Sequence, residues 1–332
     1  MSPYLVSPRY DWAFFLGPPA LALVLGIALA GTPANTPLAW LGDSPAGLGL
    51  GVLIHAHLVA VVFRSHANPA IFARHRLRFV VVPLLLFVAL LASDWIAVAA
   101  TVVATFWDVW HSGAQTFGFA RIYDRNAGVP PERDRKLDFA MNQILYVGPV
   151  LAGATLIDHV GDFALFSDFD DPISRVLAQV PGEALARRPV IAWVVGGAIA
   201  SVVATYFGVA WWRMRRGEPV SVLKLWLVTS TGVCSIVAWG FDTWGEAFFV
   251  MNLFHAVQYL ALVWWSEGRR IARGRLRRAG ALLVFFGGTF AYGAFAATVP
   301  AERHALWSLT IVVSLMHFWY DAFVWSVRRG DV

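Results

Sequence analysis

The stretch AGLGLGVLIHAHLVAVVF, residues 46–63, holds eighteen residues with no charged or polar side chain other than His55 and His57. A helix of about 20 apolar residues crosses the roughly 30 Å of hydrocarbon in a bilayer, so this stretch is long enough to span a membrane. An imidazole is costly in hydrocarbon, and an ionisable residue within a span by default indicates a functional site. The stretch therefore predicts both a membrane helix and a buried polar site.

The composition of the whole chain indicates the same solvent. Hydrophobic residues make up 58% and charged residues 14% of the 332 positions, and the mean hydropathy is +0.61. Soluble domains hold about 45–50% apolar and about 25% charged residues, so this chain lies far outside their range. We predict an all-α, polytopic integral membrane bundle that forms a single transmembrane domain over residues 1–332, in a membrane of the bacterial inner (cytoplasmic) type.

Apolar runs of sufficient length recur along the chain and predict about ten spans. The runs are 12–30, 46–63, 79–92, 95–120, 139–157, 190–212, 222–241, 246–265, 280–299 and 304–326. The run 79–92 is the shortest, and the polar break Ser93-Asp94 separates it from the next one. The longest connection, 158–189, is rich in aspartate and is expected to lie on the outer side.

Lysines and arginines set the expected orientation of these spans. They are concentrated in the loops 64–78, 121–138 and 269–278, with further clusters at 213–216 and in the C-terminal tail. Cytoplasmic loops near span ends are enriched in basic residues, so this pattern places both termini in the cytoplasm. The net charge of +5 does not require a nucleic-acid partner, because the arginines lie beside span ends, where anionic lipid headgroups are the expected partner.

Four histidines occur in four separate apolar runs, each roughly 9 to 12 residues from the arginine-bearing end of its run. They are His55, His111, His255 and His317. All four spans run from outside to inside in the predicted topology, so a rise of about 1.5 Å per residue puts the imidazoles at similar depths near the midplane. We therefore expect them to converge on one site.

Helical spacing brings further polar side chains to these faces. Residues three or four apart in a helix share a face, which places Asp108 and Gln115 beside His111 and Asp321 beside His317. His55 and His57 are about 200° apart around a helix, so only one of them can face a common centre, and the sequence does not choose between them. The candidate metal ligands are His55, His57, Asp108, His111, His255, His317 and Asp321, and the candidate catalytic side chains are Gln115, Tyr259 and Tyr320.

Imidazoles and carboxylates without thiolates are the ligand set of non-haem iron centres that activate oxygen, and they also suit zinc, manganese or copper. We expect a mononuclear or dinuclear iron site in an oxygenase or desaturase-like oxidase. Its substrate would be a lipid, a fatty acyl chain or an isoprenoid that arrives from the bilayer. No glycine-rich nucleotide fingerprint is present, so the reductant would be a separate electron-donor protein or the substrate itself.

The segment Phe106-Trp107-Asp108-Val109-Trp110-His111-Ser112 resembles the Trp-His-Ser segment of the bacterial membrane carotene-cleaving dioxygenases. The resemblance covers about a dozen residues and implies a many-spanning protein that holds one non-haem iron through histidines. The chain departs from that family at Gln115, where the family has its next histidine. The histidine boxes of membrane desaturases and alkane hydroxylases do not occur in the sequence.

Two other classes of function fit the same residues. Histidines and aspartates within spans also form proton or ion pathways in transporters, and histidines on facing helices can ligate haem axially. A structural role is the third possibility, with histidines that only form hydrogen bonds between helices. Metal content, a haem absorption band and the stability of histidine variants with and without chelator would separate these classes.

Overall fold

The structure is a computed structural model that describes residues 2–37, 44–272, 277–300 and 302–325. Within these ranges every regular element is a helix and there is no β-strand. The chain forms two compact units, each built from two segments. Unit 1 comprises Met1–Ala28 and Thr105–Phe254, and unit 2 comprises Leu29–Ala104 and His255–Val332. The single transmembrane domain expected from the composition stays a prediction.

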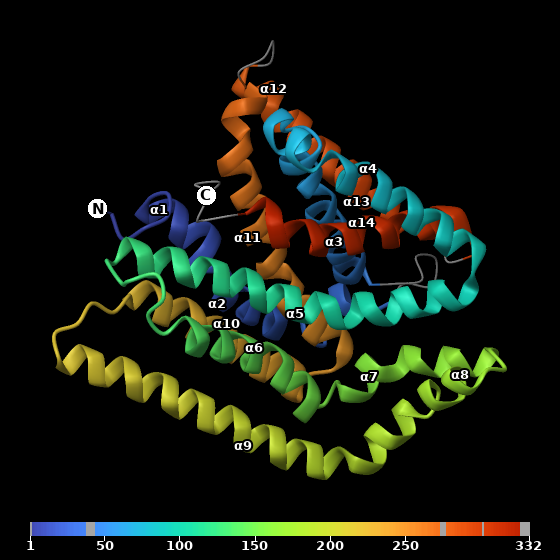
Figure 1. The fold of residues 1–332 in the computed structure, drawn as a ribbon, viewed down its shortest axis with the longest axis horizontal. Helices are drawn as coiled ribbons and strands as arrows, with labels where there is room; N and C mark the ends of the chain where they lie inside the picture. Colours follow the sequence, from blue (N-terminus) through green and yellow to red (C-terminus); the bar gives the residue numbers. More distant parts are fainter. Residues whose placement is uncertain (1, 38–43, 273–276, 301, 326–332) are drawn as a thin grey trace. The chain divides into compact units, whose positions relative to one another are not determined.

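Unit 1 contains most of the helices coloured from green to yellow in Figure 1. Its elements are α1 (Pro8–Asp11), η1 (Trp12–Leu16), α2 (Pro18–Leu29), α6 (Arg135–Ala152), α7 (Leu156–Val160), η3 (Gly161–Asp168), α8 (Pro172–Leu177), α9 (Val180–Arg215) and α10 (Val222–Phe241). Unit 2 contains η2 (Pro33–Asn35), α3 (Pro45–Ser65), α4 (Pro69–Ala92), α12 (Arg278–Leu282), η4 (Leu283–Gly287), α13 (Gly288–Ala297) and α14 (His304–Val324). Two long helices, α5 (Asp94–Asn126) and α11 (Trp244–Ala272), contribute to both units.

Seven helical segments are long and apolar enough to cross a membrane, and the number rises to nine if each of two bent pairs forms one span. The bent pairs are Pro8–Leu16 with Pro18–Leu29, at 45°, and Arg135–Ala152 with Leu156–Asp168, at 94°. The protein is therefore an all-helical integral membrane protein over its described residues. Helix α5, which covers the predicted run 95–120, does not meet this test. The ten spans and the cytoplasmic placement of both termini stay predictions, and residues 326–332 lie outside the described residues.

Two connections expected between the apolar runs are helical, because helix-start signals lie outside those runs. Helix α4 begins at Pro69, not at residue 79, so most of the expected 64–78 loop is helical. Asn68 caps α4 by accepting a hydrogen bond from the Ile71 amide at 3.3 Å, and a proline at the first helical position suits a helix start. The expected 158–189 connection is likewise mostly helical, with Asp171 and Pro172 starting α8 in the same way.

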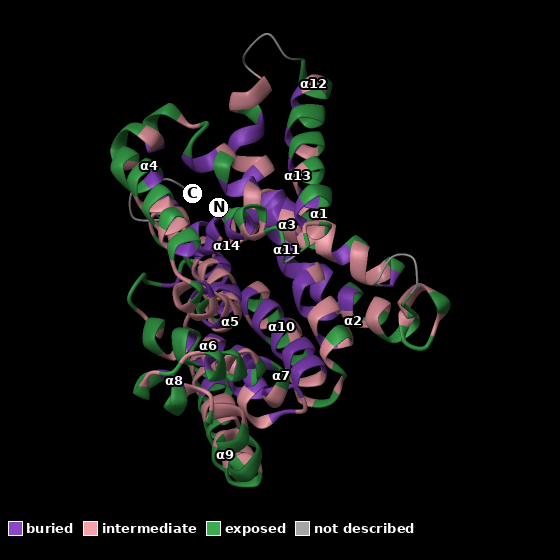
Figure 2. Ribbon diagram, turned by 90° about the vertical axis from the view of Figure 1, so that its right-hand side faces the viewer, coloured by how far each residue is buried: buried purple, intermediate pink, exposed green. Residues whose placement is uncertain are grey.

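The core of unit 1 is formed by α5, α6, α10 and α11. Buried side chains from these helices pack together, among them Val109, Tyr146, Trp239 and Phe254. About half of α10 is buried, whereas α9, which packs against α6, has only Tyr206 buried (Figure 2). The outer face of α9 is apolar, with Trp193 84% exposed, as expected for a helix that faces lipid.

Helix α3 forms the centre of unit 2, where it packs against α13 and α14 (Figure 1). The contact with α13 is a close backbone approach at Gly293. A Cβ atom at that position would lie 2.2 Å from the carbonyl oxygen of Val52 and 3.1 Å from the amide nitrogen of Ala56. Small residues allow such close approach between membrane helices. The contact of Gly293 with Ala56 holds α3 in place at the residue before His57.

Candidate metal centre

Three imidazoles from three helices of unit 2 converge on one point. His57 of α3, His255 of α11 and His317 of α14 each have at most 1% of their surface exposed. The ring of His57 meets the other two edge to face, with both centroid distances equal to 5.0 Å. One ring nitrogen from each of the three lies within 4.8 Å of the others.

This arrangement suits a metal ion held by three neutral nitrogen donors. Metal–imidazole bonds of about 2.0–2.1 Å place the nitrogens of a tetrahedral site roughly 3.4 Å apart, so small side-chain rotations would close the group around an ion. Three protein ligands leave one or more positions open, which is the pattern of catalytic sites rather than structural ones. Imidazole donors suit iron, zinc and copper.

A hydrogen bond defines the tautomer of His317. Its Nδ1 lies 3.1 Å from the carbonyl oxygen of Leu58, and a carbonyl only accepts, so Nδ1 carries the proton. Nε2 then carries the lone pair with which the ring can bind a metal. Metal-binding histidines commonly donate their other ring N–H to a backbone carbonyl, which holds the ring in position.

Tyr259 packs on the imidazoles and is held there by polar contacts. The ring centroid of Tyr259 lies 4.5 Å from that of His317 and 6.0 Å from that of His57. The Tyr259 hydroxyl donates a hydrogen bond of 2.8 Å to Oδ1 of Asp321, and the indole N–H of Trp325 donates one of 2.9 Å to the same oxygen. Asp321 is thus tied to α11 and to the residue after α14.

Within unit 2, the structure brings several of the candidate residues together. On α3 it is His57 that meets His255 and His317, whereas His55 is half-buried and does not belong to the group described above. Tyr259 packs on the imidazoles, as described. Tyr320 instead packs on Phe79 of α4, with ring centroids 4.7 Å apart. Of the two tyrosines, Tyr259 is therefore placed to act at the imidazoles.

The remaining candidates, Asp108, His111 and Gln115, lie on the part of α5 that belongs to unit 1. His111 is 3% exposed there. Close by, α5 packs on α6, since a Cβ atom at Gly113 would lie 3.1 Å from the side-chain amide nitrogen of Gln143. A role for these three residues in metal binding stays a prediction.

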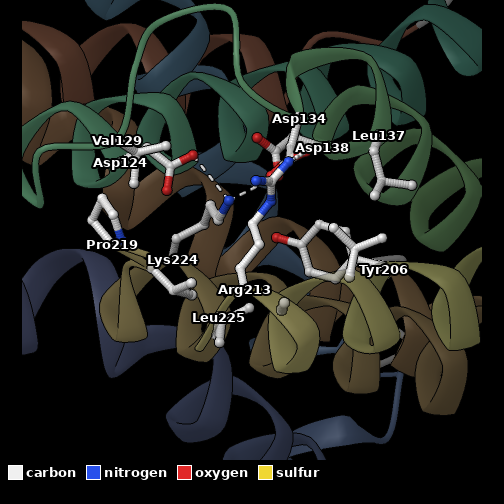
Figure 3. A pocket seen from close by; sticks show the side chains of 13 residues that line it. Asp124, Val129, Asp134, Leu137, Asp138, Tyr206, Arg213, Pro219, Lys224 and Leu225 are labelled. Carbon is white, nitrogen blue, oxygen red and sulfur yellow. Dashed lines mark hydrogen bonds and ion pairs between the residues drawn. The ribbon is translucent and has the colours of Figure 1, made fainter. Parts of the chain in front are cut away.

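Sequence reasoning missed a buried ion cluster in unit 1. Lys224 of α10 donates to Asp124 of α5 at 2.9 Å and to Asp138 of α6 at 3.0 Å (Figure 3). Arg121 pairs with both carboxylates. A cavity of about 20 Å³ lies beside Lys224, which is room for about one water molecule. The signal was available, because Lys224 lies within the first turn of an apolar helix, where a charge requires a partner.

A second missed pair, Arg64 and Glu267, lies in unit 2. Both side chains are inside long apolar helices and at most 7% exposed, with Nη1 and Oε1 2.6 Å apart. Their positions in the sequence suggested only a basic loop and the end of a span.

Comparison of the chain with protein-family models, with curated proteins and with solved structures finds no match. The local resemblance of residues 106–112 to the carotene-cleaving dioxygenases therefore stays a resemblance in that segment.

Proposed function

We propose that this protein is a membrane-embedded metalloenzyme, a non-haem iron oxygenase or desaturase-like oxidase that acts on a hydrophobic substrate from the bilayer. The observation that carries the proposal is the convergence of His57, His255 and His317 inside an apolar helical unit. Burying three imidazoles together has a desolvation cost that a structural role does not require, whereas a bound metal ion compensates it.

The residues of the chain have distinct tasks in this proposal. His57, His255 and His317 would hold the ion, and iron in such a site supplies oxygen activation. The Leu58 carbonyl holds His317 in the tautomer that leaves Nε2 as ligand. The Tyr259 hydroxyl, held by Asp321, lies next to the ligands, where it can orient a polar group of the substrate. The apolar surroundings exclude water and admit a lipid, fatty acyl or isoprenoid chain.

The test is elemental analysis of protein purified in detergent without metal supplementation. We expect about one transition-metal ion per chain, with iron as the metal, and loss of that ion in His57→Ala, His255→Ala and His317→Ala. His55→Ala is the matched control, because it removes an imidazole from the same helix two residues away and should keep the metal. Protein without stoichiometric metal, or variants of the three histidines that keep it, would overturn the proposal. A Soret absorption band would assign the histidines to haem instead.

The reaction class has its own test. Iron-loaded protein should consume dioxygen when given an isoprenoid or an unsaturated fatty acyl lipid together with a chemical reductant, and His255→Ala should abolish that consumption. Iron-loaded protein that consumes no dioxygen with either substrate would contradict an oxygenase. Proton or ion flux in vesicles that depends on the same histidines would then favour a transporter.

A further inference from the structure

The buried pair Arg64–Glu267 lies on the same side of unit 2 as the C-terminal ends of α3 and α14. Glu267 is 1% exposed and also accepts hydrogen bonds from the Asn68 amide at 3.1 Å and from Nε of Arg270 at 2.6 Å. Arg270 in turn donates to the carbonyl oxygen of Phe63 at 2.8 Å. One buried carboxylate thus connects α11 to the end of α3 and to the start of α4.

Arg64 extends this connection to the third ligand-bearing helix. Its Nη2 and Nε lie 3.3 and 3.4 Å from the carbonyl oxygen of Val324, the last residue of α14. Its guanidinium group also lies over the ring of Trp325, 4.6 Å from the centroid. The planar guanidinium has five donors in a fixed fork, so it can serve several partners from one position, which lysine cannot do. Arg64 therefore joins α3, α11 and α14, the helices that carry His57, His255 and His317.

We call Arg64, Glu267 and the Val324 carbonyl the clamp. On α3 and α14 the clamp residues are spaced from the histidines by nearly whole helical turns. Arg64 follows His57 by seven residues and Val324 follows His317 by seven residues, which is close to two full helical turns. On α3 and α14 the clamp position therefore lies on the same face as the histidine of that helix, about 10 Å along the axis. Rotation or sliding of α3 or α14 would move the imidazole and break the clamp contact together.

A continuous series of contacts also leads from the clamp to the imidazoles. Arg64 lies over Trp325, Trp325 donates to Asp321, and Asp321 accepts from Tyr259, whose ring packs on His317. All of these residues belong to unit 2. The series gives the clamp a second route, through side chains, by which it sets the position of the ring of His317.

We propose that Arg64 and Glu267 are positioning residues for the metal centre, which fix the rotation and register of α3, α11 and α14 so that the three imidazoles meet. The proposal rests on the metal site proposed above. Outer residues that orient metal ligands typically change metal affinity by about 10- to 100-fold when they are replaced, without touching the metal. The clamp should therefore affect metal binding more than it affects folding.

The test uses cobalt(II) as a spectroscopic probe in the full-length, detergent-solubilised protein. The double variant Arg64→Met/Glu267→Leu removes both charges together, because replacing a buried ion pair with apolar residues of similar volume is often neutral for stability. We expect the metal-free double variant to unfold at about the wild-type temperature. Its cobalt affinity should fall by about 10- to 100-fold, with a changed visible absorption spectrum.

Two further variants make the result decisive. Arg187→Met/Glu183→Leu removes an exposed ion pair on α9 and should leave cobalt binding unchanged. Arg64→Lys keeps the charge beside Glu267 but cannot serve Val324 and Trp325 at once, so its affinity should lie between wild type and the double variant even if the double variant does not fold. Wild-type cobalt affinity and spectrum in Arg64→Lys would overturn the clamp. Wild-type protein that binds no cobalt would overturn the metal site as well, so the two failures are distinguishable.

Discussion

The close approach of α13 to α3 makes Gly293 the position at which one methyl group should have the largest effect on unit 2. An alanine Cβ at Gly293 would lie 2.2 Å from the Val52 oxygen, whereas ordinary contacts begin at 3.4 Å. The obstructing atoms belong to backbone, so no side chain can rotate away and the helices must separate by about 1 Å. Overpacking of this kind costs about 1–3 kcal/mol.

Gly288→Ala provides the matched control, because Gly288 is in the same helix and has nothing within 4 Å of its ideal Cβ position. Both variants gain the same helix propensity, up to about 1 kcal/mol. The difference between their free energies of unfolding therefore isolates the steric term, and we expect Gly293→Ala to be less stable than Gly288→Ala by about 1–3 kcal/mol.

Unfolding in mixed detergent micelles, followed by circular dichroism, measures this difference, and cobalt binding by the same variants gives a second readout. Since Ala56 precedes His57, separation of the helices should also weaken cobalt binding by Gly293→Ala. Equal stability of the two variants would refute the close approach of α13 and α3. A stability loss without any change in cobalt binding would show instead that His57 does not depend on this contact.

Three further predictions concern unit 1. Lys224→Met leaves Asp124 and Asp138 with Arg121 as their shared cation, so the free energy of unfolding in denaturant should fall by about 3–5 kcal/mol. As a control, Arg187→Met, at an exposed pair on α9, should change it by less than about 1 kcal/mol. Cys234 is 1% exposed, so a maleimide should not label it in the native protein but should label one thiol per chain after unfolding; native labelling would contradict its burial. Burial, followed by the charge of Glu246, raises the pKa of Asp242 above its ordinary 3.8. Folding thus favours the protonated carboxyl group, and stability is lost as the pH rises through the pKa of the folded state. Asp242→Asn should therefore be more stable than wild type at pH 7. This advantage should disappear as the pH falls toward 3.8.

The sequence predicted the fold class because every helix that spans a membrane must be apolar and must satisfy its own backbone hydrogen bonds. The runs 222–241 and 246–265 are therefore found within α10 and α11 almost unchanged. Helix starts were predicted less well. Asn68 and Pro69 lie among basic residues, where hydropathy indicates a loop, although their capping chemistry starts α4.

The candidate site was predicted in part for a related reason. Hydropathy located His255 and His317 because each lies near the middle of an apolar run. It could not choose between His55 and His57, because both lie in the same run and only the packing of α3 decides which face is buried. Arg64 and Glu267 were not predicted as partners because they are 203 residues apart in the chain and meet only in the folded unit.

The buried arginine of α3 shows which face of this helix points into unit 2. A buried charge without a partner is costly in an apolar unit. Arg64 lies in the last turn of α3, where it is buried and pairs with Glu267. Positions seven residues apart share a face, which assigns His57 to the face of Arg64 and places His55 about 200° away from His57. The structure agrees, since Leu50, His57, Val61 and Arg64 are all buried. In a span with two candidate ligands, the one in register with a buried arginine is therefore the better choice.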